Sequence, residues 1–156
     1  MNARTEIQRG DVTLSALSTG RKEGPAILLS NSLGAGLDMW APQRAALEAQ
    51  YYVIGYDARG HGQSSTPAGE YTFDDLTADA IAVLDHFNVA KADYIGLSLG
   101  GMTGLGLGLD HADRFNKIVC ACARADNPAP FVSSWDDRIA AIAEGGMSAI
   151  WNGTVE

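Results

Sequence analysis

Basic residues are scarce in this sequence, and their scarcity excludes a class of partner. Eleven lysines and arginines stand against 19 aspartates and glutamates, which gives a formal net charge of −8. No basic cluster is longer than Arg21-Lys22. Because proteins that bind nucleic acid need a positively charged surface, we expect no nucleic-acid partner.

Cysteine is also rare, with two residues in the chain. Cys120 and Cys122 lie two positions apart on an expected strand, where they point to one face but cannot readily bond to each other. No further ligands at metal-binding spacing lie near them. We therefore interpret both as buried small apolar residues and expect no metal site.

Long apolar runs are absent. No segment approaches the ~20 apolar residues of a membrane-spanning helix, and residues 1–9 lack the apolar core of a signal peptide. We expect a cytoplasmic protein without a membrane partner. The chain has 156 residues, of which 46% are hydrophobic and 19% charged, so one domain with a sizeable core is possible.

Strand-like and helix-like segments alternate along the chain, which predicts an α/β fold whose mostly parallel sheet carries helices on both faces. The expected strands are residues 4–8, 11–18, 26–30, 51–56, 92–97 and 117–122, the first two forming a hairpin around Arg9-Gly10. The expected helices are residues 40–48, a helix that follows the capping box Thr72-Phe-Asp-Asp75 and ends near Asn88, and residues 102–110.

The last of these helices contains Gly104, Gly106 and Gly108, each of which costs about 1 kcal/mol against alanine. We hypothesise that the flank without side chains presses close against the sheet, which would offset this cost.

Composition changes at Asn127-Pro-Ala-Pro130, where we place the boundary between residues 1–126 and 127–156. Beyond it, Ser134-Trp-Asp-Asp137 fits a second capping box. We expect a helix from Trp135 to Gly145-Gly146 and another that begins near Met147.

The segment Gly96-Leu97-Ser98-Leu99-Gly100-Gly101 fits a strand-to-helix turn that exposes Ser98 as a nucleophile. Side chains at Gly96 and Gly100 would collide with the neighbouring strand and helix, which explains both glycines. The alternative is a glycine-rich loop beside an ordinary serine. We predict that Ser98 is the catalytic nucleophile.

Acyl chemistry at a serine also needs donors for the developing oxyanion. We assign them to the backbone N–H of Leu99, directly after the nucleophile, and to that of Leu33 in the loop Asn31-Ser-Leu-Gly-Ala-Gly36. The alternative for this segment is an ordinary strand-to-helix loop.

A third motif, Asp57-Ala-Arg-Gly-His-Gly-Gln-Ser64, follows the fourth strand. Its residue types indicate a tight loop in which Arg59 could pair with Asp57. His61 is either a catalytic base or, as we favour, part of the structure of the loop.

Together these three segments resemble the α/β-hydrolase superfamily in order and spacing. More closely, Leu29-Ser-Asn-Ser-Leu-Gly34, Gly96-Leu-Ser-Leu-Gly-Gly-Met-Thr-Gly104 and Trp135-x-x-Arg-Ile139 followed by Gly145-Gly-Met147 are similar to the 3-oxoadipate enol-lactonases. The resemblance implies hydrolysis of an enol-lactone in aromatic catabolism, the β-ketoadipate pathway, without cofactor or metal. Carboxylesterases, perhydrolases and carbon–carbon bond hydrolases share these motifs, and an inactive fragment or interaction module is a further alternative.

The resemblance also implies the first six strands of the family's fold and the start of a helical cap. The family's acid and base follow the seventh and eighth strands, whereas this sequence ends at Glu156. In the family's strand order His61 lies two strands from Ser98, and His86 and His111 are expected to be remote. Asp126 is a possible acid.

We therefore expect a missing C-terminal portion or a companion polypeptide that supplies the Asp and His of the triad and completes the fold. In the cap, Trp135 and Arg138 are candidate substrate contacts, because a dianionic product needs a cation. The alternative is a packed tryptophan beside a solvated arginine.

Overall fold

The structure is a computed structural model that describes residues 4–151. The chain forms two compact units, one ending at Arg124 and the other beginning at Ala125. The division falls two residues before the predicted boundary. Each unit is described by itself below.

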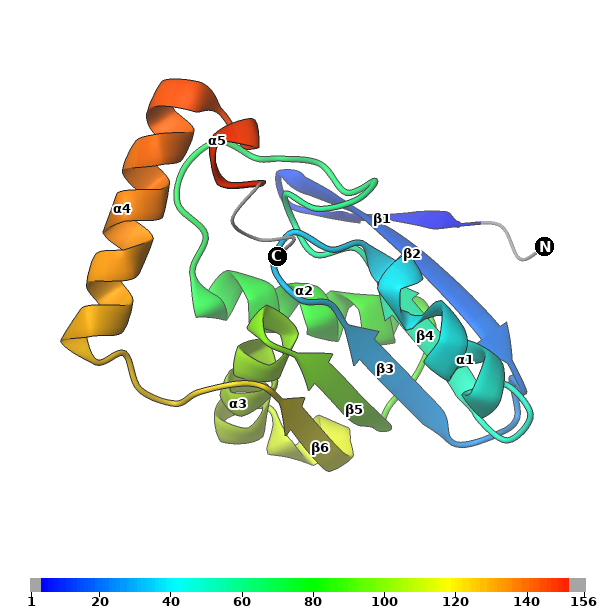
Figure 1. The fold of residues 1–156 in the computed structure, drawn as a ribbon. Coiled ribbons are helices and arrows are strands. Elements are labelled where there is room, and N and C mark those ends of the chain that lie inside the picture. The colour runs from blue at the N-terminus through cyan, green and yellow to red at the C-terminus, as the bar shows by residue number, and fades with distance from the viewer. Residues whose placement is uncertain (1–3, 152–156) are drawn as a thin grey trace. The chain divides into compact units, whose positions relative to one another are not determined.

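The first unit contains a six-stranded sheet with the order β1-β2-β4-β3-β5-β6 (Figure 1). Its strands are β1 (Thr5–Arg9), β2 (Val12–Gly20), β3 (Ala26–Ser30), β4 (Tyr52–Tyr56), β5 (Ala92–Leu97) and β6 (Phe115–Ala121). The hairpin β1–β2 and the pair β2–β4 are antiparallel, whereas β4, β3, β5 and β6 run parallel. The α/β class and the strand order of the α/β-hydrolase fold are confirmed.

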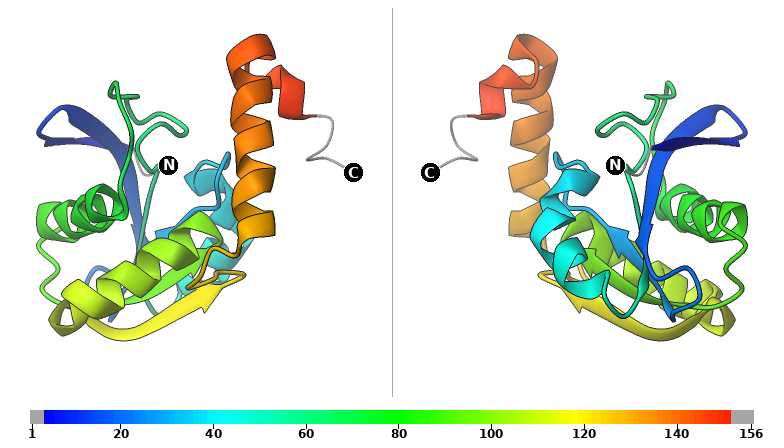
Figure 2. Two further views of the ribbon diagram at one scale, coloured as in Figure 1. Left: turned by 90° about the vertical axis from the view of Figure 1, so that its left-hand side faces the viewer. Right: turned by 90° about the vertical axis from the view of Figure 1, so that its right-hand side faces the viewer.

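Helices cover both faces of the sheet (Figure 2). The helical elements of this unit are η1 (Leu37–Trp40), α1 (Ala41–Leu47), α2 (Phe73–His86), α3 (Leu99–Asp110) and η2 (Ala112–Arg114). Alternate strand residues point to opposite faces. Leu28 and Ile54 accordingly pack in the cluster with α2 and α3, whereas Ile27 and Val53 pack with Trp40 of η1.

The capping box at the start of α2 is confirmed. The Asp75 amide donates to the Thr72 hydroxyl at 3.1 Å, and the Thr72 amide donates to the Asp75 carboxylate at 3.1 Å. These bonds satisfy two backbone donors that the helix itself leaves without partners. The Thr72 amide and hydroxyl together hold the pKa of Asp75 below its usual range.

The glycines of α3 face different neighbours, so the close-packing hypothesis holds in part. A Cβ on Gly104 would lie 2.8 Å from the Tyr94 ring and 3.0 Å from the Cys120 sulfur, both on the sheet. A Cβ on Gly106 would instead lie 2.9 Å from the Thr77 methyl of α2. The missing side chains therefore allow α3 to approach the sheet at one position and α2 at another.

The prediction that both cysteines are buried on one strand is wrong. Strand β6 ends at Ala121, and Cys122 is exposed with a φ of 50°. Cys120 is half-buried beneath α3, and burial raises the pKa of its thiol. The reason is that β6 is the last strand of the described sheet, where side chains have fewer neighbours than in its centre.

The second unit contains α4 (Ala129–Gly145) and α5 (Ser148–Trp151). Helix α4 begins six residues before the predicted start at Trp135, so the second capping box is wrong. Pro128 caps the helix in extended conformation and Pro130 lies in its first turn, where a missing N–H costs no helical hydrogen bond. The Ser134 hydroxyl bonds to the Phe131 carbonyl instead. The predicted end is confirmed, since Gly146 follows the helix with a φ of 67°.

No helix in the described part of the chain is both long and apolar enough to cross a membrane.

Two alanine substitutions in α3 test the close approach of this helix to the sheet. We expect Gly104→Ala to destabilise the protein by about 1–3 kcal/mol, because the added methyl group overpacks against the buried Tyr94 ring. Gly108→Ala is the matched control: its Cβ meets the Ile118 side chain at an ordinary 3.5 Å, so the helix propensity of alanine should stabilise the protein by about 0.5–1 kcal/mol. The free energy of unfolding in urea measures both effects. Gly106→Ala should also destabilise, and a gain there would contradict close packing against Thr77.

Candidate active site

Ser98 lies at the turn from β5 to α3 in a strained backbone conformation. Its φ of 53° and ψ of −110° lie in a region that costs a non-glycine residue about 1–3 kcal/mol. The Ser98 amide donates to the Ala121 carbonyl of β6 at 2.9 Å, and the Ser98 carbonyl accepts from the Met102 amide at 2.8 Å. Both sides of the strained residue are therefore tethered by backbone hydrogen bonds.

The glycines on either side of Ser98 are required by close backbone contacts. A Cβ on Gly96 would overlap the carbonyl group of Gly100, and a Cβ on Gly100 would overlap the carbonyl group of Ser30 on β3. The predicted reason for both glycines is thus confirmed. The turn has the geometry of a nucleophile elbow.

Buried hydroxyl groups form hydrogen bonds next to the elbow, and they were not predicted from the sequence. The Tyr94 hydroxyl donates to the Gly100 carbonyl at 2.6 Å, and the Ser30 and Tyr56 hydroxyls lie 3.2 Å apart. Burial raises the pKa of Tyr56 to about 12 and that of Tyr94 well above 10. Both phenols therefore stay neutral and can donate hydrogen bonds over the whole physiological range. Both tyrosines lie in segments that the sequence predicts as strands, but the strand prediction does not show that their hydroxyls support the elbow.

The loop expected to carry an oxyanion donor begins beside the elbow. Asn31 accepts a hydrogen bond from the Gly100 amide at 2.9 Å through its carbonyl, and its side-chain amide donates to the Tyr56 carbonyl at 3.0 Å. Leu33 follows in the exposed part of the loop, with half of its surface accessible. Gly34, with a φ of 76°, allows the chain to turn there.

Leu99 is the first residue of α3. Backbone N–H groups in the first turn of a helix have no partner within the helix, so they can bind a developing negative charge. The structure thus brings the loop of Leu33 and the helix start of Leu99 to the elbow, at the carboxyl ends of β3 and β5. Their function as oxyanion donors stays a prediction.

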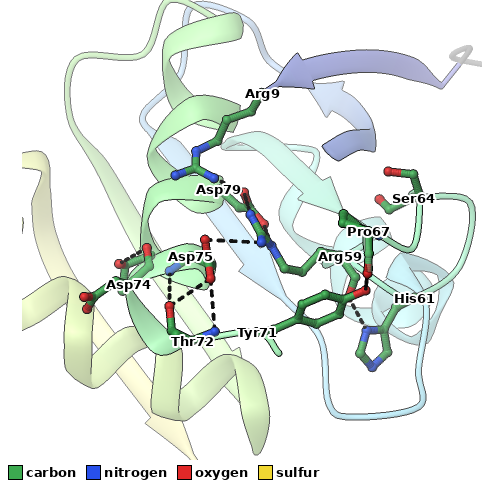
Figure 3. Close-up of polar contacts among 12 residues, drawn as sticks. Arg9, Arg59, His61, Ser64, Pro67, Tyr71, Thr72, Asp74, Asp75 and Asp79 are labelled. Carbon is green, nitrogen blue, oxygen red and sulfur yellow. Dashed lines mark hydrogen bonds and ion pairs between the residues drawn. The ribbon is translucent and has the colours of Figure 1, made fainter. Parts of the chain in front are cut away.

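The predicted pairing of Arg59 with Asp57 is wrong. Arg59 forms a bidentate ion pair with Asp79 of α2, at 2.7 and 2.9 Å, and lies 3.2 Å from Asp75 (Figure 3). Its guanidinium also lies 5.5 Å from the centre of the Tyr71 ring. The hydrogen bond to Asp79 raises the pKa of Arg59. Asp57 is unavailable as a partner because Arg4 and two backbone amides already occupy its carboxylate.

The imidazole of His61 contacts its own loop. Its Nδ1 lies 2.9 Å from the Arg59 carbonyl, as Figure 3 shows. This contact favours the structural interpretation of His61. In the order β4-β3-β5, two strand spacings, about 10 Å, separate the end of β4 from the end of β5.

The other two histidines lie away from the elbow. His111 follows the 12-residue helix α3, about 18 Å along its axis from the end that carries Ser98. His86 is exposed in the last turn of α2. Together with Tyr52 and Phe87, it lines a pocket of about 630 Å³. This pocket lies at the amino ends of β3 and β4, whereas the elbow lies at the carboxyl end of β5. Within residues 4–151, the structure brings no histidine to Ser98.

The remaining predicted site residues lie in the second unit. Trp135 and Arg138 are neighbours on α4, with the guanidinium 4.8 Å from the centre of the indole ring. Trp135 is half-buried and Arg138 is exposed. Asp126 precedes α4 in the same unit. No group of three potential metal-ligating side chains was found in the described part of the chain.

The raised pKa of Tyr56 predicts a loss of stability at alkaline pH. The phenol ionises near pH 10 in the unfolded chain and near 12 in the fold, so its contribution is complete below pH 10 and is lost as the pH rises to 12. At pH 11 the expected loss is about 1.4 kcal/mol. Urea unfolding at pH 9 and 11 measures it. Tyr56→Phe should lose less over the same interval, and equal losses in both proteins would contradict the prediction.

Comparisons with known proteins agree with this geometry. The family model for the alpha/beta hydrolase fold matches residues 25–153. The chain is 41% identical over 140 residues to 3-oxoadipate enol-lactonase 2 of Acinetobacter baylyi, which covers 90% of this chain and 52% of that protein. It is 37% identical to a protein of Caulobacter segnis named as a carbamate hydrolase, covering 79% of this chain and 47% of the relative.

The crystal structure of the enol-lactonase from Burkholderia xenovorans superposes with a TM-score of 0.91 and 37% identity, over 97% of this chain and 58% of the other. This chain therefore spans about half the length of the curated relatives it matches. Since the family model covers most of the chain and the elbow, sheet order and helices agree with it, the chain belongs to the α/β-hydrolase fold family.

Proposed function

We propose that this chain provides the nucleophile of a serine hydrolase of the enol-lactonase type. The strained elbow at Ser98 is the observation that supports this most strongly. In the proposed reaction the Ser98 oxygen attacks the lactone carbonyl, and a base accepts its proton. The oxyanion that forms is bound by the amides of Leu33 and Leu99.

The ring C–O bond then breaks, the enol oxygen leaves with a proton from the protonated base, and the enol tautomerises to the ketone. Water, deprotonated by the same base, attacks the acyl-enzyme ester. The ester C–O bond breaks, and the base returns its proton to the Ser98 oxygen. The net reaction adds one water across the lactone and yields an oxo-dicarboxylic acid. No cofactor takes part in these steps.

The acid and base come, in this proposal, from a second polypeptide or a further C-terminal portion. Two observations support this. Among the described residues no hydrogen bond joins a histidine to Ser98, and β6 pairs only with β5 there. The outer edge of β6 thus offers unpaired backbone groups, and half of the Val119 surface is accessible. Natural sheets normally cover or pair such an edge.

The proposed substrate class is supported by the names of the relatives and by two side chains of α4. An enol-lactone of an oxo-dicarboxylic acid carries a carboxylate, and Arg138 stacked on Trp135 offers a cation beside an apolar surface. A carbamate or simple ester is the second candidate, favoured by the relative named as a carbamate hydrolase. Carboxylesterases, perhydrolases and carbon–carbon bond hydrolases use the same elbow.

Covalent labelling tests whether Ser98 is an activated nucleophile. A fluorophosphonate should label Ser98 when the polypeptide that supplies the base is present, because labelling requires a serine with general-base assistance. Ser98→Ala should abolish labelling, whereas Ser148→Ala, which removes an exposed hydroxyl from α5, should leave it unchanged. Peptide mass analysis locates the label. An unlabelled Ser98 in the complete protein would favour the inactive-module interpretation.

The substrate class is tested by comparing an enol-lactone with neutral aryl esters. We expect the lactone to be hydrolysed faster. Arg138→Gln should raise KM for the carboxylate-bearing lactone about tenfold, because a charged hydrogen bond contributes about 1.5–3 kcal/mol, and should leave KM for a neutral ester unchanged. The decrease in lactone absorbance measures the first rate, and release of the aryl alcohol measures the second. Faster ester hydrolysis would contradict the lactonase proposal, and equal KM changes would contradict the Arg138 contact.

A further inference from the structure

The carboxylate of Asp57 is fully buried, and its hydrogen-bond partners are all donors. Its Oδ1 accepts from the Leu37 amide at 2.6 Å, and its Oδ2 accepts from the Gln63 amide at 2.9 Å. Oδ2 also accepts from the guanidinium of Arg4, which reaches on to Asp38 at 2.8 Å. The buried charge is thus compensated by one cation and two backbone dipoles.

These donors come from three separate segments. Arg4 precedes β1, Leu37 ends the loop that contains Leu33, and Gln63 lies in the loop that follows β4. The two loops close tightly around the carboxylate: a Cβ on Gly62 would overlap it, and a Cβ on Gly36 would lie 3.1 Å from Oδ1. Asp57 therefore fastens the loop of Leu33 to the end of β4.

That loop is fixed at both ends and exposed in the middle. At its start, Asn31 is bonded to Gly100 of the elbow and to Tyr56 of β4. At its end, the Leu37 amide is bonded to Asp57. Leu33 lies between these anchors, so the position of its amide relative to Ser98 depends on both.

We propose that Asp57 is a positioning residue that sets the place of the Leu33 amide, and hence the geometry of the oxyanion hole, through its hydrogen bond to the Leu37 amide. This inference rests on the proposed function. Asp57 does not touch the substrate in this arrangement. It acts by holding the loop.

Asparagine cannot replace Asp57 in this position, although it has nearly the same shape. An amide has one acceptor oxygen, and its NH₂ group only donates. If the oxygen faces Leu37, the NH₂ group meets the donors of Arg4 and Gln63. If the group is flipped, the NH₂ group meets the Leu37 amide. In the first orientation the side chain is repelled by Arg4 and Gln63, and in the second by Leu37. In neither orientation can it hold both loops together, so Asp57→Asn should loosen the loop of Leu33.

Asp79 offers a matched control, since it is equally buried and also bound to arginine. It accepts from Arg59 and, at 3.1 Å, from Arg9, and it lies on α2. Its side-chain hydrogen bonds, to Arg9 and Arg59, do not involve residues 31–37. Asp79→Asn therefore makes the same change of charge and a comparable loss of a buried ion pair, without touching the loop.

The experiment measures kcat and KM of the complete protein, at a temperature where every variant is folded, together with amide hydrogen exchange over residues 31–40. Asp57→Asn should lower kcat on the order of 10²–10³-fold, as removal of an oxyanion donor does, with KM changed less than about threefold. Exchange of residues 33–37 should accelerate at least about tenfold. Asp79→Asn should lower Tm but keep kcat within about threefold of the parent.

A milder variant serves if Asp57→Asn does not fold. Gly36 has a φ of −91°, which alanine adopts readily, so Gly36→Ala keeps all three donors while its methyl group pushes against Oδ1. We expect kcat to fall about three- to tenfold at an unchanged Tm.

The possible failures are distinguishable. An inactive parent would contradict the proposed function, and exchange over residues 33–37 would still decide whether Asp57 holds the loop. An active parent whose Asp57→Asn variant keeps its kcat, or whose loop stays as protected as in Asp79→Asn, would overturn the inference.

Discussion

The contact between the first turn of α3 and the carboxyl end of β3 is the constraint on which the candidate site depends. The Gly100 amide donates to Asn31, and a side chain at Gly100 would overlap the Ser30 carbonyl. The Tyr94 hydroxyl donates a hydrogen bond to the Gly100 carbonyl. Because α3 cannot move away without losing these bonds, Ser98 is kept in a conformation that a serine in a free loop would leave.

Two buried carboxylates fix the segments that surround the elbow. Asp57 holds the loop of Leu33, and Asp79 holds α2 through Arg59. A buried charge is costly unless every lone pair has a partner. Each carboxylate therefore favours the one arrangement of the chain in which all its donors reach it, whereas apolar packing tolerates several arrangements. Gly62 in the motif between residues 57 and 64 is explained by the same carboxylate, since a side chain there would overlap it.

Features with a local cause were predictable from the sequence. A few adjacent residues suffice to predict the α2 capping box, the glycines around Ser98 and the positions of the strands. The strand order followed instead from the family resemblance. Long-range choices were not predictable. Arg59 lies two residues from Asp57 and 20 from Asp79, and spacing alone favours the nearer acid. The structure reverses the choice because Arg4, 53 residues away from Asp57 in sequence, already occupies the nearer acid.

The elbow and the proton-transfer machinery are separable parts of the proposed mechanism. The contacts described above that fix Ser98 come from β3, β5, β6 and α3. None of them involves a histidine. The strain at Ser98 is therefore maintained by the sheet and its first helices, independently of any base. Under the proposed function, the segment that supplies the base has only to place an imidazole beside a serine whose conformation is already set.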